Sequence, residues 1–98
     1  GGNVSDTRSF TFDPSIAGQI DSFTELQTNV PTGVTYTTTN FTTNGNDTAN
    51  PSFQIAVGGG ATPGIYTFEV EYGLLDAGSN PLGPLTGNIF NFTIQITP

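Results

Sequence analysis

The stretch "ATPGIYTFEVEY", residues 61–72, decides the fold class because a turn signal runs directly into a strict alternation of apolar and polar residues. Thr62-Pro63-Gly64 favours a turn, since proline presets its own backbone angle and glycine adopts conformations that other residues avoid. Successive side chains of an extended chain then point to opposite faces. The expected inner face carries Tyr66, Phe68, Val70 and Tyr72, and the expected outer face carries Thr67, Glu69 and Glu71. The stretch predicts a half-buried strand with its carboxylates toward solvent.

Other segments alternate in the same way, and clusters of turn-forming residues separate them. The alternating segments are 10–12, 34–36, 53–57 and 90–96, and turn-forming residues fill 30–33, 44–47, 58–60 and 73–87. Short strands with frequent turn signals are typical of an antiparallel β-sandwich. We predict an all-β fold for residues 1–98, a single domain of about six to seven strands with Greek-key connections and no disulfide.

Residues 16–27 carry conflicting signals. Apolar residues recur here at helical spacing, and Asp13-Pro14 suits the N-cap and first position of a helix. The recurring residues are Ile16, Ile20, Phe23 and Leu26. Gly18 and the surrounding Ser, Thr and Asn residues disfavour a helix, and the turn at 30–33 suits the end of a bulged strand. We favour a bulged strand, with a short helix as the alternative.

The inward-facing apolar side chains of these segments form the predicted core. They are Phe10, Phe12, Ile20, Phe23, Leu26, Val34, Tyr36, Phe53, Ile55, Val57, Tyr66, Phe68, Val70, Phe90, Phe92, Ile94 and Ile96.

The composition points to an uncharged surface. Charged residues make up 9% of the chain, against about 25% in typical domains, so solubility rests on the many Thr, Asn and Gly residues. Arg8 is the only cation, and the formal net charge is −7. Because this charge opposes binding to phosphate backbones and anionic lipids, we expect neither nucleic acid nor a membrane as a partner.

Several residue types are absent, and their absence excludes whole classes of chemistry. The chain has no Lys, His, Cys, Met or Trp, so it lacks thiol and Schiff-base nucleophiles, Ser-His-Asp triads and Cys/His zinc sites. Without Lys, it also cannot form a Lys–Asn or Lys–Asp isopeptide cross-link. A glycosidase acid needs a buried carboxyl, whereas Glu69 and Glu71 are predicted to face solvent. We predict a protein that is not an enzyme.

No targeting or spanning segment is visible in the sequence. No apolar run approaches the ~18 residues of a spanning helix, and the start, Gly1-Gly2-Asn3, does not resemble a signal peptide. The expectation is a mature product or an excised module.

Three segments, "NVPTGVTYT" (29–37), "FQIAVGGGATPGIYTFEVEY" (53–72) and "NFTIQITP" (91–98), carry a resemblance to a known family. Their turns and alternation resemble immunoglobulin-like (Ig-like) modules of bacterial and archaeal cell-surface and secreted proteins. The resemblance implies an Ig-like sandwich in an extracellular location, serving to space, stiffen or pack a larger assembly. It also implies a tyrosine corner at Tyr66, with the ring in the core and the hydroxyl bonded to nearby backbone. The chain lacks the Cys pair and buried Trp of antibody domains.

Two kinds of modification or ion site are hypotheses from the residues. Asn-x-Ser/Thr sequons occur at Asn3, Asn40, Asn46 and Asn91, although a chain this rich in Asn and Thr forms some by chance. Calcium is the one metal that the side chains permit, because hard oxygen ligands suffice for it. The candidate ligands for a structural calcium are Asp76, Asn80, Glu69 and Glu71, although the 76–80 segment is also an ordinary turn sequence. We expect no other cofactor.

The favoured function is a structural module or subunit of a cell-surface layer, filament or adhesin, with identical subunits or other modules as partners. Subunits could assemble by strand exchange, in which the alternating segment Asn3 to Asp13 completes a neighbouring sheet. The alternative is a carbohydrate- or ligand-binding module of a secreted enzyme. Polysaccharide binding needs exposed aromatic rings, and Phe41 and Tyr72 are the rings expected to be accessible.

Overall fold

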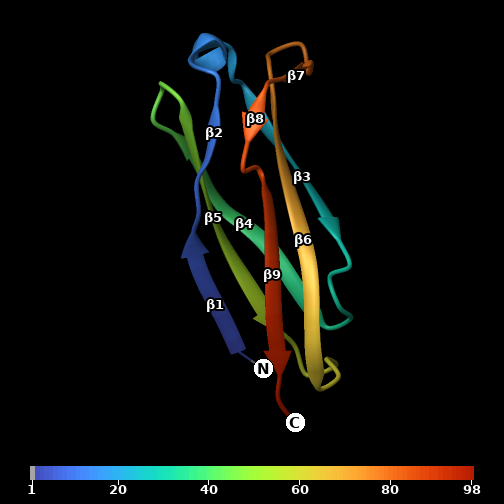
Figure 1. Cartoon of the computed structure of the whole chain (residues 1–98). Coiled ribbons are helices and arrows are strands. Elements are labelled where there is room, and N and C mark those ends of the chain that lie inside the picture. Colours follow the sequence, from blue (N-terminus) through green and yellow to red (C-terminus); the bar gives the residue numbers. More distant parts are fainter. Residues whose placement is uncertain (1) are drawn as a thin grey trace.

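Two antiparallel sheets lie face to face in the computed structural model, which describes residues 2–98 (Figure 1). Sheet A contains β1 (Gly2–Thr7), β2 (Phe10–Phe12), β4 (Val34–Thr43), β5 (Thr48–Val57) and β8 (Leu85–Thr86). Sheet B contains β3 (Ser22–Thr28), β6 (Gly64–Leu75), β7 (Pro81–Leu82) and β9 (Ile89–Ile96). A 3-10 helix, η1 (Pro14–Gln19), connects β2 to β3. The predicted all-β fold of two packed antiparallel sheets is confirmed.

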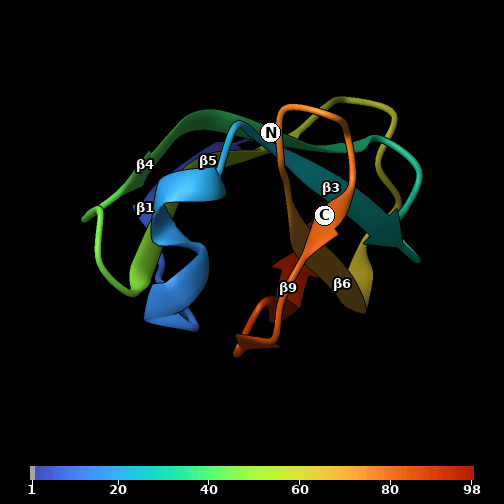
Figure 2. The ribbon, with the colours of Figure 1, turned by 90° about the horizontal axis from the view of Figure 1, so that it is seen from above.

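Each sheet is built around one long strand. In sheet A, β5 pairs with β4 along one edge and with β1 and β2 along the other. In sheet B, β6 pairs with β3 along one edge and with β9 and β7 along the other. Figure 2 looks down the molecule and shows β4, β5 and β1 on one side and β3, β6 and β9 on the other. The domain is elongated, 48 × 20 × 19 Å, and both chain ends lie at the end opposite η1 (Figure 1).

Within the stretch 61–72, residues 64–72 form the first part of β6, as the alternation predicts. Phe68, Val70 and Tyr72 are buried, whereas Thr67 and Glu71 are exposed and Glu69 is half-buried. Tyr66 is half-buried, and its hydroxyl donates a hydrogen bond of 2.9 Å to the carbonyl of Thr62 in the preceding loop. The ring folds back over Gly64, where an added Cβ would lie 3.2 Å from the tyrosine oxygen.

Residues 14–28 divide into a helix and a strand, so the bulged strand predicted for 16–27 is wrong in its first half. Asp13 caps η1 by accepting a 2.9 Å hydrogen bond from the Ser15 amide, and this bond lowers the pKa of the Asp13 carboxyl. Pro14 occupies the first helical position, as expected for the helical alternative. The strand β3 begins at Ser22, after the chain has passed from sheet A to sheet B.

The core lies between the sheets and is rich in phenylalanine. The buried apolar residues are Phe10, Phe12, Ile16, Val34, Tyr36, Ala49, Phe53, Ile55, Phe68, Val70, Tyr72, Leu74, Phe90, Phe92 and Ile96. Phe23 and Leu26, both predicted to be core residues, are 37% and 62% exposed. Their spacing of three places them on opposite faces of a strand, and Leu26 pairs with the outward-facing Glu71. Ile16, Ala49, Tyr72 and Leu74 are buried in the core, although they are not among the residues predicted to form it.

A chain of hydroxyl groups closes the gap between the edge strands β3 and β4, which we call the β3–β4 seam. The hydroxyls of Tyr36 and Tyr72 lie 2.7 Å apart across the core, and Thr38 lies 2.8 Å from Tyr72 and also donates to Glu25 of β3. Each hydroxyl has one proton and a carboxylate only accepts, so the donors run in order from Tyr36 through Tyr72 and Thr38 to Glu25. We call these four residues the hydroxyl relay.

Other side chains complete the seam. The Gln27 amide donates to Glu25 at 2.8 Å and to the backbone carbonyl of Tyr36 at 3.0 Å. The rings of Phe23 and Phe41 stack with centroids 4.4 Å apart. Because these contacts join β3 to β4, they connect sheet B to sheet A where no backbone ladder does so among the described residues.

We expect Tyr72→Phe to destabilise the fold more than Tyr36→Phe. Removing the Tyr72 hydroxyl leaves the buried Tyr36 hydroxyl without its acceptor, at a cost of about 1–3 kcal/mol, whereas Tyr36→Phe leaves Tyr72 bonded to Thr38 and costs about 0.5–1.5 kcal/mol. Urea unfolding at neutral pH measures both values. Equal losses would contradict the donor order of the hydroxyl relay.

Stability should fall at alkaline pH. Burial raises the pKa of Tyr36 and of Tyr72 above the usual 10.0, so each tyrosine ionises at a higher pH in the folded state than in the unfolded chain. The contribution of these two tyrosines to the free energy of unfolding is therefore fully present below pH 10.0. It is lost as the pH rises above 10.0, by up to about 1.4 kcal/mol per pH unit for each tyrosine. Urea midpoints measured from about pH 8 to pH 11 test this. The stability of a Tyr36→Phe variant should decline less steeply with pH than that of the parent chain. An unchanged slope would show that Tyr36 does not contribute to the alkaline loss of stability.

Candidate functional site

The second seam of the sandwich, between β1 and β9, is open. Among residues 2–98, β1 pairs only with β5 and β9 only with β6, so each presents one free backbone edge. Between them lies a groove of about 560 Å³, which we call the β1–β9 groove. Its lining comprises residues 2–4 of β1, Ile55 and Val57 of β5, and residues 92–97. Val4, which points between the sheets, is 61% exposed because no strand of sheet B covers it.

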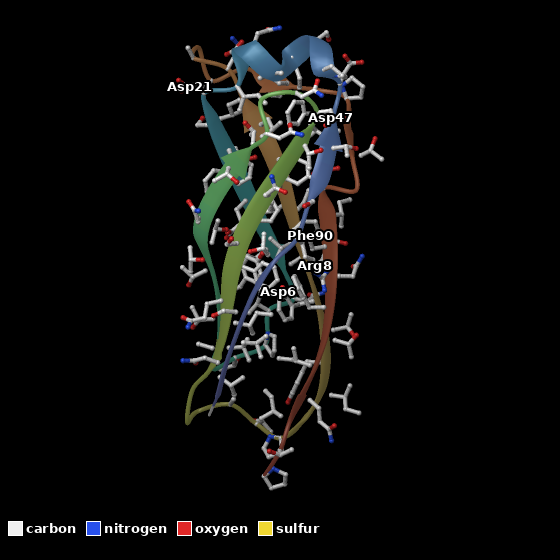
Figure 3. The ribbon with its side chains drawn as sticks, turned by 90° about the vertical axis from the view of Figure 1, so that its left-hand side faces the viewer. Asp6, Arg8, Asp21, Asp47 and Phe90 are labelled. Carbon is white, nitrogen blue, oxygen red and sulfur yellow. The ribbon has the colours of Figure 1, made fainter. Side chains whose placement is uncertain are left out.

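Arg8 lies at the junction of β1 and β2, outside the groove lining but over its lining residue Phe92. Its guanidinium carbon is 4.4 Å from the ring centroid of Phe92 and 5.6 Å from that of Phe90 (Figure 3). Its backbone amide donates to the carbonyl of Pro51, which holds the junction on β5. The only cation of the chain thus covers two core rings of β9 by cation–π contact.

Asp6 brings one negative charge to the same place. Its register opposite Phe53 turns the side chain toward the interior side of β1, and the residue is exposed (Figure 3). Its carboxylate accepts a 2.8 Å hydrogen bond from the Thr7 amide. The groove therefore has an apolar floor, and one charge of each sign lies next to its lining residues. Sequence analysis singled out Arg8 only as the lone cation, because its ring contacts join residues far apart in the chain.

The outer face of sheet A is the second distinctive surface. Nine side chains form three registered rows across β1, β5 and β4, and we call them the sheet A face. The rows are Asn3–Ala56–Thr35, Ser5–Gln54–Thr37 and Thr7–Ser52–Asn40. None of the nine is charged, and the only charged residue of these three strands is Asp6, which points to the opposite face of sheet A. This face offers hydroxyl and amide groups without net charge.

The residues predicted to bind calcium do not come together. Asp76 uses its carboxylate within its own loop, accepting hydrogen bonds from the amides of Gly78 and Asn80 at 2.9 Å, and the bond from Asn80 is the main cause that lowers its pKa. Glu69 and Glu71 lie on the outer face of β6. The described residues hold no group of three or more acidic side chains positioned to share a metal ion.

All four sequon asparagines are exposed. Asn3 and Asn40 lie in the sheet A face, Asn91 on the outer face of β9, and Asn46 in the loop between β4 and β5. Their exposure permits glycan attachment, which stays a prediction.

The predicted aromatic platform does not exist as expected. Tyr72 is fully buried and belongs to the hydroxyl relay, so the expectation of an accessible ring is wrong. Phe41 is half-buried with one face against Phe23. The cause is the strand period, which places Tyr72 inward like Val70 and Phe68.

Comparison with known proteins adds no assignment. The chain matches no protein-family model, no curated protein and no solved structure. No helix in residues 2–98 has the length and apolar character needed to cross a membrane.

We expect Arg8→Ala to destabilise the fold by about 1 kcal/mol, because it uncovers the rings of Phe90 and Phe92 and removes the cation–π contact. Arg8→Met keeps an apolar stem over the rings, so it should recover part of the loss. Urea unfolding measures both variants. If Arg8→Ala unfolds at the same urea concentration as the parent chain, the guanidinium does not support the seam.

Proposed function

We propose that this chain is a non-enzymatic structural module that packs against identical or similar modules in an extracellular surface layer, filament or adhesin. The observation that carries the proposal is the sheet A face, a registered array of nine side chains without a charge. In a chain of net charge −7, most contacts between copies would bring acidic residues together. The sheet A face is a surface where two copies can meet without that repulsion.

The chemistry of this face suits repeated weak contacts. Hydroxyl and amide groups must exchange hydrogen bonds with water for bonds with a neighbour, so each contact contributes little net free energy. Water-bridged contacts of this kind add up when many copies are arrayed side by side. Abundant Thr and Asn, the low number of charges, and the exposed sequons at Asn46 and Asn91, which lie outside the sheet A face, support an extracellular location.

We also propose that the sandwich has Ig-like, Greek-key connections. The chain crosses from β3 to the β4–β5 hairpin in the other sheet and returns in β6, which pairs with β3. This order supports a Greek key folded over two sheets.

Strand exchange of Asn3 to Asp13 stays a prediction, and its movable part is β1. Every residue of β1 is exposed, whereas Phe10 and Phe12 are buried in the core. Exchange limited to residues 2–7 would leave these rings in place. Polysaccharide binding has less support, because Tyr72 is buried.

The sheet A face can be tested with a pair of acidic substitutions. Ser5→Glu/Thr37→Glu places two carboxylates in its central row, at exposed positions, and should raise the concentration needed for assembly by about tenfold or more. The control, Thr28→Glu/Thr67→Glu, adds the same charge at exposed positions on the outer face of sheet B. Light scattering over a concentration series provides the measurement.

Two results would overturn this proposal. An equal effect of both double variants would show that total charge, and not the sheet A face, controls assembly. Hexose mass on Asn3 or Asn40 in protein from its natural source would show that glycans cover the face.

A further inference from the structure

We propose that β9 is a docking edge, on which a second copy of this chain pairs β9 to β9 in antiparallel orientation, so that sheet B continues through both copies. The inference rests on the proposed role as a packing module and names one specific contact between copies. It concerns the open seam and not the sheet A face.

Three of the four long edge strands carry a feature that opposes pairing with another chain. β3 has the inward-pointing Glu25, and β1 has the inward-pointing Asp6. β4 has a register shift between Thr38 and Asn40 that interrupts its regular ladder. Inward charges and bulges are the devices by which proteins keep sheet edges from pairing. The gap at the β3–β4 seam is, in addition, spanned by side-chain hydrogen bonds.

β9 has none of these features. Its eight residues, "IFNFTIQI", contain no charge, no proline and no glycine, and its register with β6 is continuous from Ile89 to Ile96. Within residues 2–98, the edge of β9 away from β6 pairs with no strand. A long, regular, uncharged edge with alternating apolar residues is a template for adding a strand.

The β1–β9 groove gives such pairing an apolar contribution. Val4 is 61% exposed and Ile94 is half-buried, both facing the groove. A strand laid along β9 would add its own inward side chains beside Ile94 and Ile96. These side chains would remove apolar surface of the groove from water, which favours association.

The charges favour a second copy as the occupant. An antiparallel pair of β9 strands meets no charge at any register, and the nearest outer-face acids are Glu69 and Glu71 on β6. In the continued sheet, β6 and its counterpart lie three strand spacings apart, roughly 14 Å. This separation exceeds the screening length of about 8 Å at physiological ionic strength.

The open seam also carries one charge of each sign, Asp6 and Arg8, close to the groove. Because Arg8 is the only Lys or Arg of the chain, any contact between copies that pairs side chains of opposite charge must include it.

The test uses an edge variant, Thr93→Glu/Gln95→Glu. Both residues are exposed on the outer face of β9, so the change leaves the core intact but places like charges opposite one another across the new strand pair. We expect the wild-type chain to reach twice its mass of 10.2 kDa in sedimentation equilibrium, and the edge variant to raise the dimer dissociation constant by about tenfold or more. Thr28→Glu/Thr67→Glu, with the same added charge, should dimerise like wild type.

A charge-reversal arm establishes the contact itself. Thr93→Lys/Gln95→Lys mixed in equal amounts with the edge variant should form a heterodimer, because opposite charges then face each other. Circular dichroism on each variant shows that it is folded.

A wild-type chain that stays a monomer at the highest concentration, an edge variant that dimerises normally, or a mixture that fails to pair would each overturn the proposal. The experiments also distinguish failure of the β9 docking proposal from failure of the proposed packing through the sheet A face. If Ser5→Glu/Thr37→Glu disrupts assembly while the edge variant does not, the sheet A face is the packing surface and β9 is not. If only the edge variant disrupts assembly, β9 is the packing surface and the sheet A face is not.

Discussion

The fold depends on how the two sheets are held together at the β3–β4 seam, and the hydroxyl relay is the interaction that does this. Tyr36 belongs to sheet A and Tyr72 to sheet B, so their 2.7 Å contact joins the sheets through the middle of the core. Because the Glu25 carboxylate can only accept hydrogen bonds, it fixes the direction of donation along the whole hydroxyl relay. A buried polar chain tolerates one arrangement far better than any other, so it specifies which edges face each other.

This closure makes the two sides of the sandwich unlike each other. At the β3–β4 seam, an inward carboxylate is satisfied by Thr38 and Gln27. At the opposite seam, the core rings Phe90 and Phe92 are covered by one guanidinium, and a groove lies beside it. The β3–β4 seam is therefore closed by contacts within a single chain. The β1–β9 seam leaves an apolar surface and unpaired backbone groups accessible. The uncharged sheet A face is a second surface, and it is the one on which the proposed packing between copies rests.

Local patterns in the sequence predicted the local elements, and contacts between distant residues were not predictable. The turn at 62–64 and the following alternation gave β6 correctly, because both signals act over a few residues. Leu26 was misassigned because residues spaced by three share a face in a helix but not in a strand. Tyr72 and its partner Tyr36 are 36 residues apart, and no sequence pattern near either residue predicts that their hydroxyls meet. The β1–β9 groove lies between the first and last strands, so it follows only from the complete topology.

The position of both chain ends at one end of the domain determines how it responds to tension (Figure 1). Force applied through the two ends pulls Gly2 away from Val57 and Ile96 away from Gly64, the outermost pairs of two edge strands. The residue pairs that join each edge strand to its neighbour then break one after another, so only the outermost intact pair bears the force at any moment. Such a domain yields at low force. In the assembly proposed above, mechanical load would therefore pass through contacts between neighbouring domains and not along the polypeptide.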